Sequence, residues 1–472
     1  MFERLLGEAL GRGDARVLAR AGLLAESELL CLGRHTVSGL LTTCGQQDRD
    51  WSAAYRLFEC DRVEISGLFA RSRKAVCRLL GADAPLVAML DDTLMRKRGR
   101  KVAGTSWRRD PLGPRFCNNI IWAQRFLQVS AALPEVADGL SRARAVPISF
   151  LPAPSPRKPR RAAPDEEWEA YHAELKASAL SLRGAEQIAQ LRLQLDRDAE
   201  NARRELVVTV DGGYTNRTVL KGLPDRVTLI GRVRKDAKLF APPENHPGRG
   251  RKRVYGRQLP TPEQLRQDES TPWEKVNAFA AGKIHEFQVK SLAPCRWKAA
   301  GGRDVRIIVI RPLAFRPTLK SRVLYRQPGY LICTDPDLPR DKIIQYYVWR
   351  WEIELNFREE KTLLGAAEAQ VRNPKAAAAA PAFKVAAYSL LLAANALCHG
   401  NITPPPRPKW QKQYPTGQRI TTQQLIALLR TEIWGRALGA NNFEGFVDKH
   451  SSKTKPLKIS PSPEYAVTYA FR

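Results

Sequence analysis

The stretch ELVVTVDGGYTN (residues 205–216) contains a β-branched apolar run that stops at Asp211 and is followed by two glycines. Such a run, bounded by turn residues, is typical of a buried strand. A helical stretch over 165–204, opened by acidic residues, precedes it, and a second strand pattern, DRVTLIGRVR (225–234), follows. Strand, long helix, strand and further strand predict an α/β sheet with functional side chains at the strand ends.

The sequence before this helix also reads as sheet. PLVAMLDDT (85–93) is a short apolar run that ends in Asp91 and Asp92, and FCNNIIWAQRFLQVSAAL (116–133) alternates as paired strands do. Together they predict the opening meander of a mixed sheet. The following FLPAPSPRKPRRAAP (150–164) is rich in proline and cations, which indicates a surface linker.

Five regions are expected along the chain. They are a helical N-terminal DNA-binding region (1–80), the first part of the catalytic core (81–234), a β-rich insertion (235–325), the second part of the core (326–395) and a C-terminal region (396–472). Within the first region, LLCLGRHTVSGLLTTCG (29–45) has the rhythm of a helix-turn-helix reader, but small helical bundles share that rhythm. The two alternatives stay open.

The composition points to a nucleic-acid partner. A formal net charge of +29 over 472 residues predicts attraction to a polyanion. The 8 cysteines are spaced singly, which excludes a zinc site of the usual spacing and favours reduced thiols in the cytosol. The long apolar run AAAAAPAFKVAAYSLLLAANALC (376–398) is interrupted by Pro381 and Lys384, so it is expected to be a core helix and no membrane partner is predicted.

Three basic stretches stand near the predicted core: RKRGRK (96–101), PRKPRR (156–161) and GRGRKR (248–253). Such stretches are solvated loops in most proteins. Beside a site that acts on DNA they are expected to contact phosphates, which gives affinity without sequence reading.

The stretch YYVWRWEIELNFREEK (346–361) carries the third acidic position. On one continuous helix Tyr347, Arg350, Glu354 and Lys361 would fall within roughly 60° of one another. A weak surface pair between Arg350 and Glu354 is the simplest interpretation. The alternative is a site, because Asp91 or Asp92, Asp211 and Glu354 supply the hard oxygen ligands that two-metal phosphoryl transfer requires.

These four residues fit the Y-x2-R-x3-E-x6-K signature, and the chain resembles the insertion-sequence-four superfamily of bacterial DDE transposases. LVAMLDDT and VVTVDGGY look like that family's two aspartate motifs, and the resemblance covers most of residues 80–395. It implies an RNase H-like mixed sheet core interrupted by a β-rich insertion, with helical N- and C-terminal regions. The family's hydroxyl after the first motif aligns with Thr93, which favours Asp91, while a shifted register would select Asp92.

The resemblance also implies an activity and its site. It implies Asp91, Asp211 and Glu354 as ligands of two Mg²⁺ ions, with Mn²⁺ as a substitute, and cut-and-paste transposition of DNA ends into target DNA. A homodimer on DNA and a bacterial, cytoplasmic, nucleoid-associated location follow from the same likeness. The residues expected to contact DNA are Tyr347, Arg350, Lys361, Tyr330, Arg358, Arg96, Lys97, Arg98 and Lys101.

Two alternatives remain at this stage. Tyr330 stands where the family often has a tryptophan that stacks on an extruded base, but it could equally be a core residue, and Trp273 and Trp297 are rival stackers. The protein could also be an RNase H-like nuclease without strand transfer, or a domesticated DNA-binding protein that no longer cuts.

Overall fold

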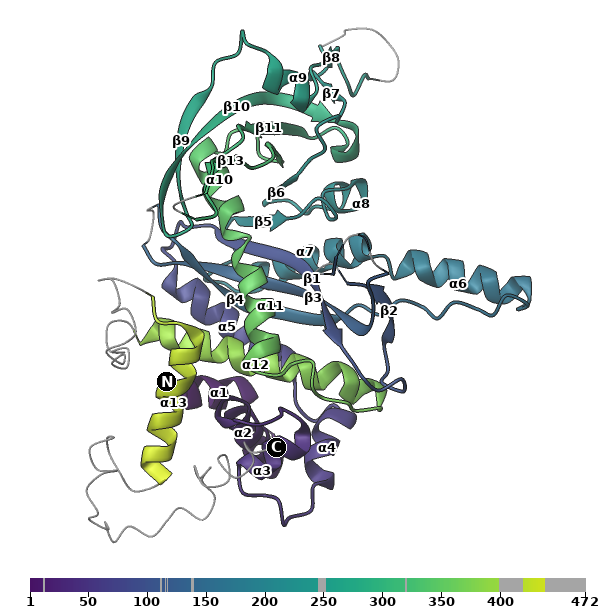
Figure 1. Ribbon diagram of the computed structural model, residues 1–472, viewed down its shortest axis with the longest axis vertical. Coiled ribbons are helices and arrows are strands. Elements are labelled where there is room, and N and C mark those ends of the chain that lie inside the picture. Colours follow the sequence, from purple (N-terminus) through teal and green to yellow (C-terminus); the bar gives the residue numbers. More distant parts are fainter. Residues whose placement is uncertain are drawn as a thin grey trace.

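The computed structural model describes residues 1–11, 13–110, 113–114, 116, 118–136, 140–244, 252–318, 321–398 and 419–437. Twelve strands of these residues form one mixed sheet, and helices gather at both ends of the chain (Figure 1). The strands of this sheet are β1 (Leu86–Arg96), β2 (Thr105–Arg109), β3 (Ile120–Pro134), β4 (Ala143–Pro152), β5 (Leu206–Val210), β6 (Val227–Arg232), β7 (Leu239–Phe240), β8 (Gln258–Leu259), β9 (Glu274–Ala280), β10 (Lys283–Trp297), β11 (Asp304–Ile310) and β14 (Gly329–Cys333). The predicted α/β fold with an RNase H-like mixed sheet is confirmed.

The helices precede, interrupt and follow this sheet. They are α1 (Phe2–Leu10), α2 (Ala15–Leu30), α3 (Val37–Thr43), α4 (Ser52–Glu59), α5 (Ile65–Leu79), α6 (Asp165–Ala177), α7 (Leu180–Asp196), α8 (Arg217–Lys221), α9 (Pro262–Gln267), α10 (Arg340–Trp349), α11 (Glu352–Thr362), α12 (Pro374–Leu397) and α13 (Thr422–Ala437), with the 3-10 turn η1 (Lys298–Ala300). A separate two-stranded sheet pairs β12 (Ala314–Phe315) with β13 (Leu324–Tyr325).

The centre of the sheet has the order β3, β1, β5, β6 and β14. Antiparallel pairing of β1 with β3 and of β3 with β4 forms the predicted meander, and β5 lies parallel to both β1 and β6. The parallel register aligns Leu90 of β1 with Val210 of β5, so the residues that follow these two lie side by side.

The two faces of β1 are covered by different helices. Val87 and Met89 pack in a cluster with residues of α10 and α11. Leu86, Ala88 and Leu90 point the other way, into a larger cluster with α5, α7 and α12. Successive side chains of a strand face opposite sides of the sheet. Over Leu86–Leu90, the parity of a residue therefore decides which helices it meets.

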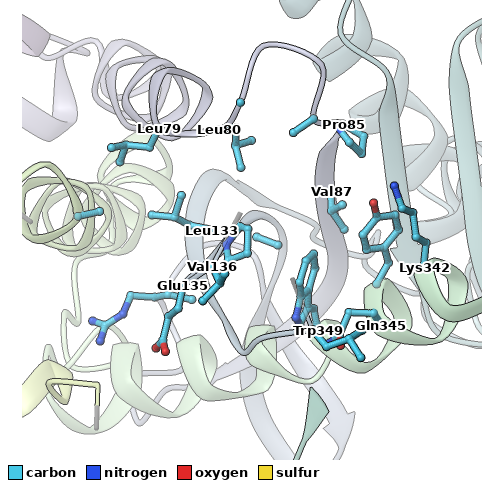
Figure 2. A pocket seen from close by; sticks show the side chains of 18 of the residues that line it. Leu79, Leu80, Pro85, Val87, Leu133, Glu135, Val136, Lys342, Gln345 and Trp349 are labelled. Carbon is cyan, nitrogen blue, oxygen red and sulfur yellow. The ribbon is translucent and has the colours of Figure 1, made fainter. Parts of the chain in front are cut away.

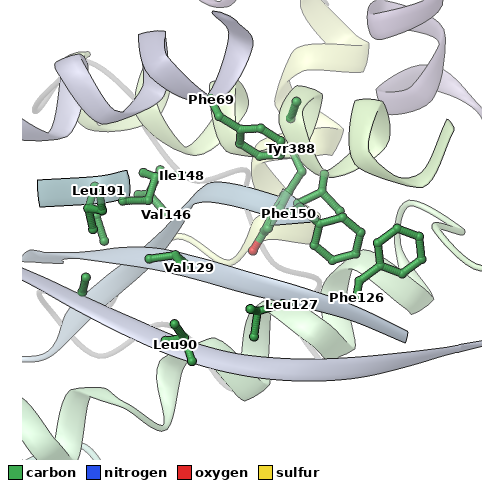
Figure 3. Close-up of a cluster of buried hydrophobic side chains, with 14 of the residues drawn as sticks. Phe69, Leu90, Phe126, Leu127, Val129, Val146, Ile148, Phe150, Leu191 and Tyr388 are labelled. Carbon is green, nitrogen blue, oxygen red and sulfur yellow. The ribbon is translucent and has the colours of Figure 1, made fainter. Parts of the chain in front are cut away.

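The larger cluster joins both ends of the chain to the sheet (Figure 3). Phe126 and Phe150 stack within it with ring centroids 4.6 Å apart, and Phe69 of α5 and Tyr388 of α12 close it from the other side. Helix α12 is long and apolar enough to cross a membrane, but 89% of its most apolar window is buried inside the fold. It is the core helix that its sequence predicted.

The predicted helix-turn-helix stretch ends α2 and forms α3, where five residues are buried and none is exposed. The turn between the two helices is fastened to the core, because His35 contacts Glu28 and its backbone N–H donates to Glu368. A recognition helix has to present side chains to the major groove. This packing favours the helical-bundle interpretation of residues 29–45.

The region 235–325 is rich in strands, as expected, but it continues the core sheet. β11 pairs with β14, and β10 then carries β9 and β7 on the far side. The insertion therefore lengthens the sheet beyond β14. Of its basic stretch 248–253, residues 248–251 lie outside the described residues.

Two predictions about elements were wrong. The stretch 165–204 is not one helix, since α6 ends at Ala177 and α7 begins at Leu180. The reason is a change of surroundings: α6 has no buried residue, whereas α7 buries five against the sheet. β1 also does not end at Asp91. It continues to Arg96 along β3, and only its pairing with β5 stops at Leu90.

Candidate active site

Asp211 follows directly after β5, in a turn that holds its carboxylate in place. Its Oδ1 accepts hydrogen bonds from the backbone N–H groups of Gly213 (2.9 Å) and Tyr214 (3.3 Å), and the Thr215 hydroxyl donates to its carbonyl oxygen (2.8 Å). The turn lies tightly against β6, since a Cβ on Gly231 would come within 2.1 Å of the Thr215 hydroxyl. Glycine at this position lets the turn approach the sheet.

Asp91 lies next to Asp211 because of the parallel register. It is the first residue of β1 beyond the paired Leu90, as Asp211 is the first beyond Val210. Burial and, to a smaller extent, the negative charge of Asp211 raise the pKa of Asp91 to about 7, although Arg350 opposes the shift. A buried carboxylate beside a second negative charge is a place where a cation is favoured.

The cation present at this pair is Arg350. Its Nη1 lies 3.0 Å from Asp91 Oδ2, in a pair whose side chains are only 12% and 14% exposed. Tyr347 packs beside it, with the guanidinium 5.8 Å from the ring centroid, and its hydroxyl is buried with no hydrogen-bond partner among the described residues. Burial raises the pKa of Tyr347, so the hydroxyl remains a donor.

Arg350 also marks a break in the predicted signature helix, which was expected to be continuous. α10 ends at Trp349 and α11 begins at Glu352, and the backbone N–H groups of Ile353 and Glu354 bond to carbonyls three residues back. Such a tightened turn advances by about 120° per residue instead of about 100°. Glu354 is therefore rotated away from Arg350, and the expected pair between these two side chains is replaced by the pair with Asp91.

Asp92 faces the opposite side of the sheet. Its Oδ1 accepts a hydrogen bond from the Tyr214 hydroxyl (2.9 Å), and its Oδ2 lies 3.2 Å from Nε of Arg125. Tyr214 packs against α7, where a Cβ on Gly184 would come within 2.8 Å of its ring. Asp92 thus belongs to a network under α7, away from Asp211 and Arg350.

Glu354 lies on α11, partly exposed, on the helix that covers the face carrying Asp91. Its charge acts on Lys361, whose pKa is lowered by burial and raised by Glu360 and Glu354. Within the described part of the chain, no group of three His, Cys, Asp or Glu side chains is close enough together to hold a metal ion. The structure thus brings Asp91 and Asp211 together and leaves Glu354 on the neighbouring helix.

The residues expected to contact phosphates differ in exposure. Arg98, Lys101 and Arg358 are exposed, and Arg96 is exposed too, although it pairs with Asp110. The prediction for Lys97 was wrong. Its side chain is buried and its ammonium donates to the carbonyls of Ala367 and Ala369, both at 2.8 Å. Alternation along the end of β1 turns this one lysine of the basic stretch inward.

A pocket of about 930 Å³ opens beside Asp211. Tyr330 and Trp297 both line it, whereas Trp273 does not. The Tyr330 ring is only 8% exposed and its hydroxyl donates to Glu263. Cations surround the aromatic pair: Arg217, Arg232, Arg234, Lys235 and Arg266. Arg232, which ends β6 next to Asp211, was not predicted from the sequence. It could have been found as a charged residue at the end of the strand that lies parallel to β5.

A second pocket, of about 820 Å³, lies elsewhere (Figure 2). Its lining combines Val87 at the start of β1 with Leu133, Trp349 and the end of α12, and neither Asp91 nor Asp211 borders it. It is therefore separate from the carboxylate pair.

Glu360 gives a test of the packing of α11. It is fully buried, and burial raises its pKa to about 8, a shift that the nearby Gln128 amide offsets only in part. Its pKa is higher in the folded than in the unfolded state, so it costs no stability below the unfolded pKa. Stability then falls as pH rises toward about 8.

We expect Glu360→Gln to remove this pH dependence. The variant should match the wild type at a pH of about 5 and exceed it in Tm at about 9, since ionising the group costs up to a few kcal/mol. Thermal melts across pH measure this, with the exposed Glu205→Gln as the control. Parallel Tm curves for Glu360→Gln and the wild type would contradict it.

The mixed sheet, with two aspartates brought together at neighbouring strands and cations around them, defines the class of RNase H-like nucleases. A family model for the DDE superfamily endonucleases matches residues 6–300, more than half of the chain, and the protein belongs to this family. The match includes Asp91 and Asp211 and ends before Glu354. A search of curated proteins found no match.

Proposed function

We propose that the protein is a transposase that binds the terminal inverted repeats of a bacterial insertion sequence, cleaves the ends and joins them to target DNA. The observation that carries this proposal is the pair Asp91 and Asp211 on one face of the sheet, with Tyr347 and Arg350 of the signature stretch packed against it. Membership of the DDE endonucleases supports the cleavage step. The Y-x2-R-x3-E-x6-K spacing, which lies beyond the matched residues, supports the insertion-sequence-four superfamily.

The residues present fit divalent cations. Asp91 and Asp211 are hard oxygen donors, and the raised pKa of Asp91 beside Asp211 is the electrostatic strain that a cation relieves. Asp91, Asp211 and Glu354 would hold two Mg²⁺ ions, for which Mn²⁺ can substitute. Bound there, the ions would activate water or a 3′-hydroxyl and stabilise the leaving oxygen.

The chain's own cations would position the DNA. The Arg350 guanidinium lies next to the carboxylate pair. When a scissile phosphate is placed there, Arg350 would leave Asp91 and pair with the phosphate. The Tyr347 hydroxyl, buried beside Arg350, would donate to the same backbone, and Lys361 in the last turn of α11 would add a positive charge. Exposed Arg96, Arg98, Lys101 and Arg358 would hold flanking phosphates. The proposed DNA-binding region 1–80 would read DNA with a surface other than α3.

A gel assay on duplexes from the flanks of the coding region tests the proposal. With Mg²⁺, nicked ends followed by joined products are expected, and two chains should assemble on two ends. Nicking without joined products would instead support the alternative, a related nuclease without strand transfer. Binding without cleavage would support a domesticated DNA-binding protein.

The exposed linker cations should contribute affinity without specificity. We expect the triple change of Arg157, Arg160 and Arg161 to serine to weaken binding to end and random duplexes equally. The slope of log K against log salt should flatten by about 2–3, since fewer counterions are released. Lys158 is kept because its ammonium lies 5.6 Å from the Trp168 ring centroid. Fluorescence anisotropy at several salt concentrations measures this binding. A loss of specificity for end duplexes with an unchanged salt slope would contradict the prediction.

The two aromatic residues of the pocket should behave differently. If the Tyr330 ring supports an unstacked base, Tyr330→Ala spares first-strand nicking and impairs later steps by up to about 1–3 kcal/mol, while Tyr330→Trp is tolerated. Trp297→Ala is the comparison, since Trp297 lines the same pocket and is more exposed. Step-resolved product analysis with a parallel Tm separates these cases. A Tyr330→Ala protein that is less stable and slow at every step would place the ring in the core alone.

A further inference from the structure

Helix α6 stands out from the body as one half of an arm (Figure 1). The basic linker that follows β4 runs outward, and α6 returns toward α7, with Lys158 of the linker lying over Trp168 of the helix. None of the thirteen residues of α6 is buried. An isolated helix of this length is marginal in water, and most helices in proteins are stabilised by packing of one face. Against the described residues, α6 has no such packed face.

The sequence of α6 has two features of a docking helix. Trp168, Tyr171, His172 and Leu175 have the spacing i, i+3, i+4 and i+7, which places them within about 100° of one another. Trp168 and Tyr171 contact each other edge to face, and Leu175 is 41% exposed. Carboxylates flank this stripe: Asp165, Glu166, Glu167, Glu169 and Glu174.

The charge of α6 is opposite to that of the protein. Five carboxylates stand against one lysine in a chain whose formal net charge is +29. Acidic residues in the first turn suit a helix N-terminus, but Glu169 and Glu174 lie beyond it. None of the charged side chains of α6 forms an ion pair with another described residue. These carboxylates are therefore available to a surface of opposite charge, which a basic protein provides and the phosphates of DNA do not.

We propose that α6 docks on the basic surface of a second copy of this chain when two DNA ends are brought together. The inference rests on the proposed function, in which two ends require two catalytic cores. In this arrangement the linker cations Arg157, Arg160 and Arg161 face DNA, while the carboxylates of α6 and the part of its apolar stripe that Lys158 does not cover, from Tyr171 to Leu175, face the partner. Complementary charge sets the orientation and the aromatic stripe supplies the buried contact.

Photo-crosslinking tests the contact directly. Benzoylphenylalanine replaces Leu175 in the full-length protein, and light and isotopically heavy chains are mixed on duplexes from the two flanks of the coding region. Crosslinks between light and heavy peptides are expected from position 175. The matched control is position 193, because Leu193 on α7 is also 41% exposed. Crosslinks only within one chain or to DNA, or equal yields from both positions, would overturn the proposal.

Charge reversal gives a second readout. Glu169→Lys with Glu174→Lys should lower the fraction of two-chain complexes by about tenfold in sedimentation velocity, since like charges then face each other. Glu205→Lys with Asp225→Lys makes the same charge change at exposed positions away from the arm and should leave assembly intact. Nicking by single chains is measured in the same samples. Wild-type protein that nicks but never pairs through α6 refutes this inference alone, whereas wild type that neither binds nor nicks refutes the proposed function as well.

Discussion

Asp91→Asn should abolish metal-dependent nicking, whereas Asp92→Asn should leave the chemical step intact. Asp91 shares its side of the sheet with Asp211 and Arg350, so the neutral amide removes a ligand charge from the proposed site. Asp92 lies on the other side, bonded to Tyr214 and Arg125. An asparagine there can still accept the Tyr214 hydrogen bond, and only the charge facing Arg125 is lost. Single-turnover nicking of a labelled duplex measures both.

The control for the Asp92 network is Tyr214→Phe, which removes the same hydrogen bond from the opposite partner. Both Asp92→Asn and Tyr214→Phe should lower Tm modestly and leave the nicking rate of the folded protein near that of the wild type. DNA binding by Asp91→Asn should persist, because the surrounding cations are unchanged. If Asp92→Asn were inactive and Asp91→Asn active, Asp92 and not Asp91 would be the first ligand of the site.

The two aspartate positions, although not the end of β1, could be predicted from sequence because local patterns mark them. A β-branched run closed by Asp211 and two glycines specifies a strand and its turn, and PLVAML specifies its neighbour. The choice between Asp91 and Asp92 was open, since the two residues are adjacent in sequence. It depends on which helices cover each face of β1, and that is a property of long-range packing.

Other features had no local signal. The inward turn of Lys97 depends on carbonyls of Ala367 and Ala369, about 270 residues away along the chain. The break between α10 and α11 follows no proline or glycine, and its i−3 bonding coincides with the pairing of Arg350 to Asp91 on another element. The split between α6 and α7 reflects where the sheet ends beneath them. In each case long-range packing, or its absence, decides the outcome, and the local pattern alone does not.

The same helix break makes Glu354 the most informative residue to change. As a metal ligand it must be anionic, so Glu354→Gln keeps the shape and loses the charge. We expect nicking and strand transfer to fall by orders of magnitude, while DNA binding survives or tightens because a negative charge near the phosphate is removed. Tm should change little, since Glu354 is partly exposed and forms no ion pair with another described residue.

The structure also decides which control is suitable for Glu354. Glu359 on the same helix is unsuitable as an inert control, because it accepts hydrogen bonds from Tyr388 (2.5 Å) and Thr422 (2.7 Å), which tie α11 to the C-terminal helices. Glu359→Gln should therefore lower Tm. Glu352→Gln is the better match in position, since this carboxylate of the first turn pairs with Arg419 at 3.1 Å, away from Asp91; its loss can also change Tm, so the nicking rates of the folded proteins are compared. Two results would show that Glu354 is not a ligand: an active Glu354→Gln protein, or an equal loss of nicking in Glu354→Gln and Glu352→Gln. Another residue would then have to be the third ligand beside Asp91 and Asp211.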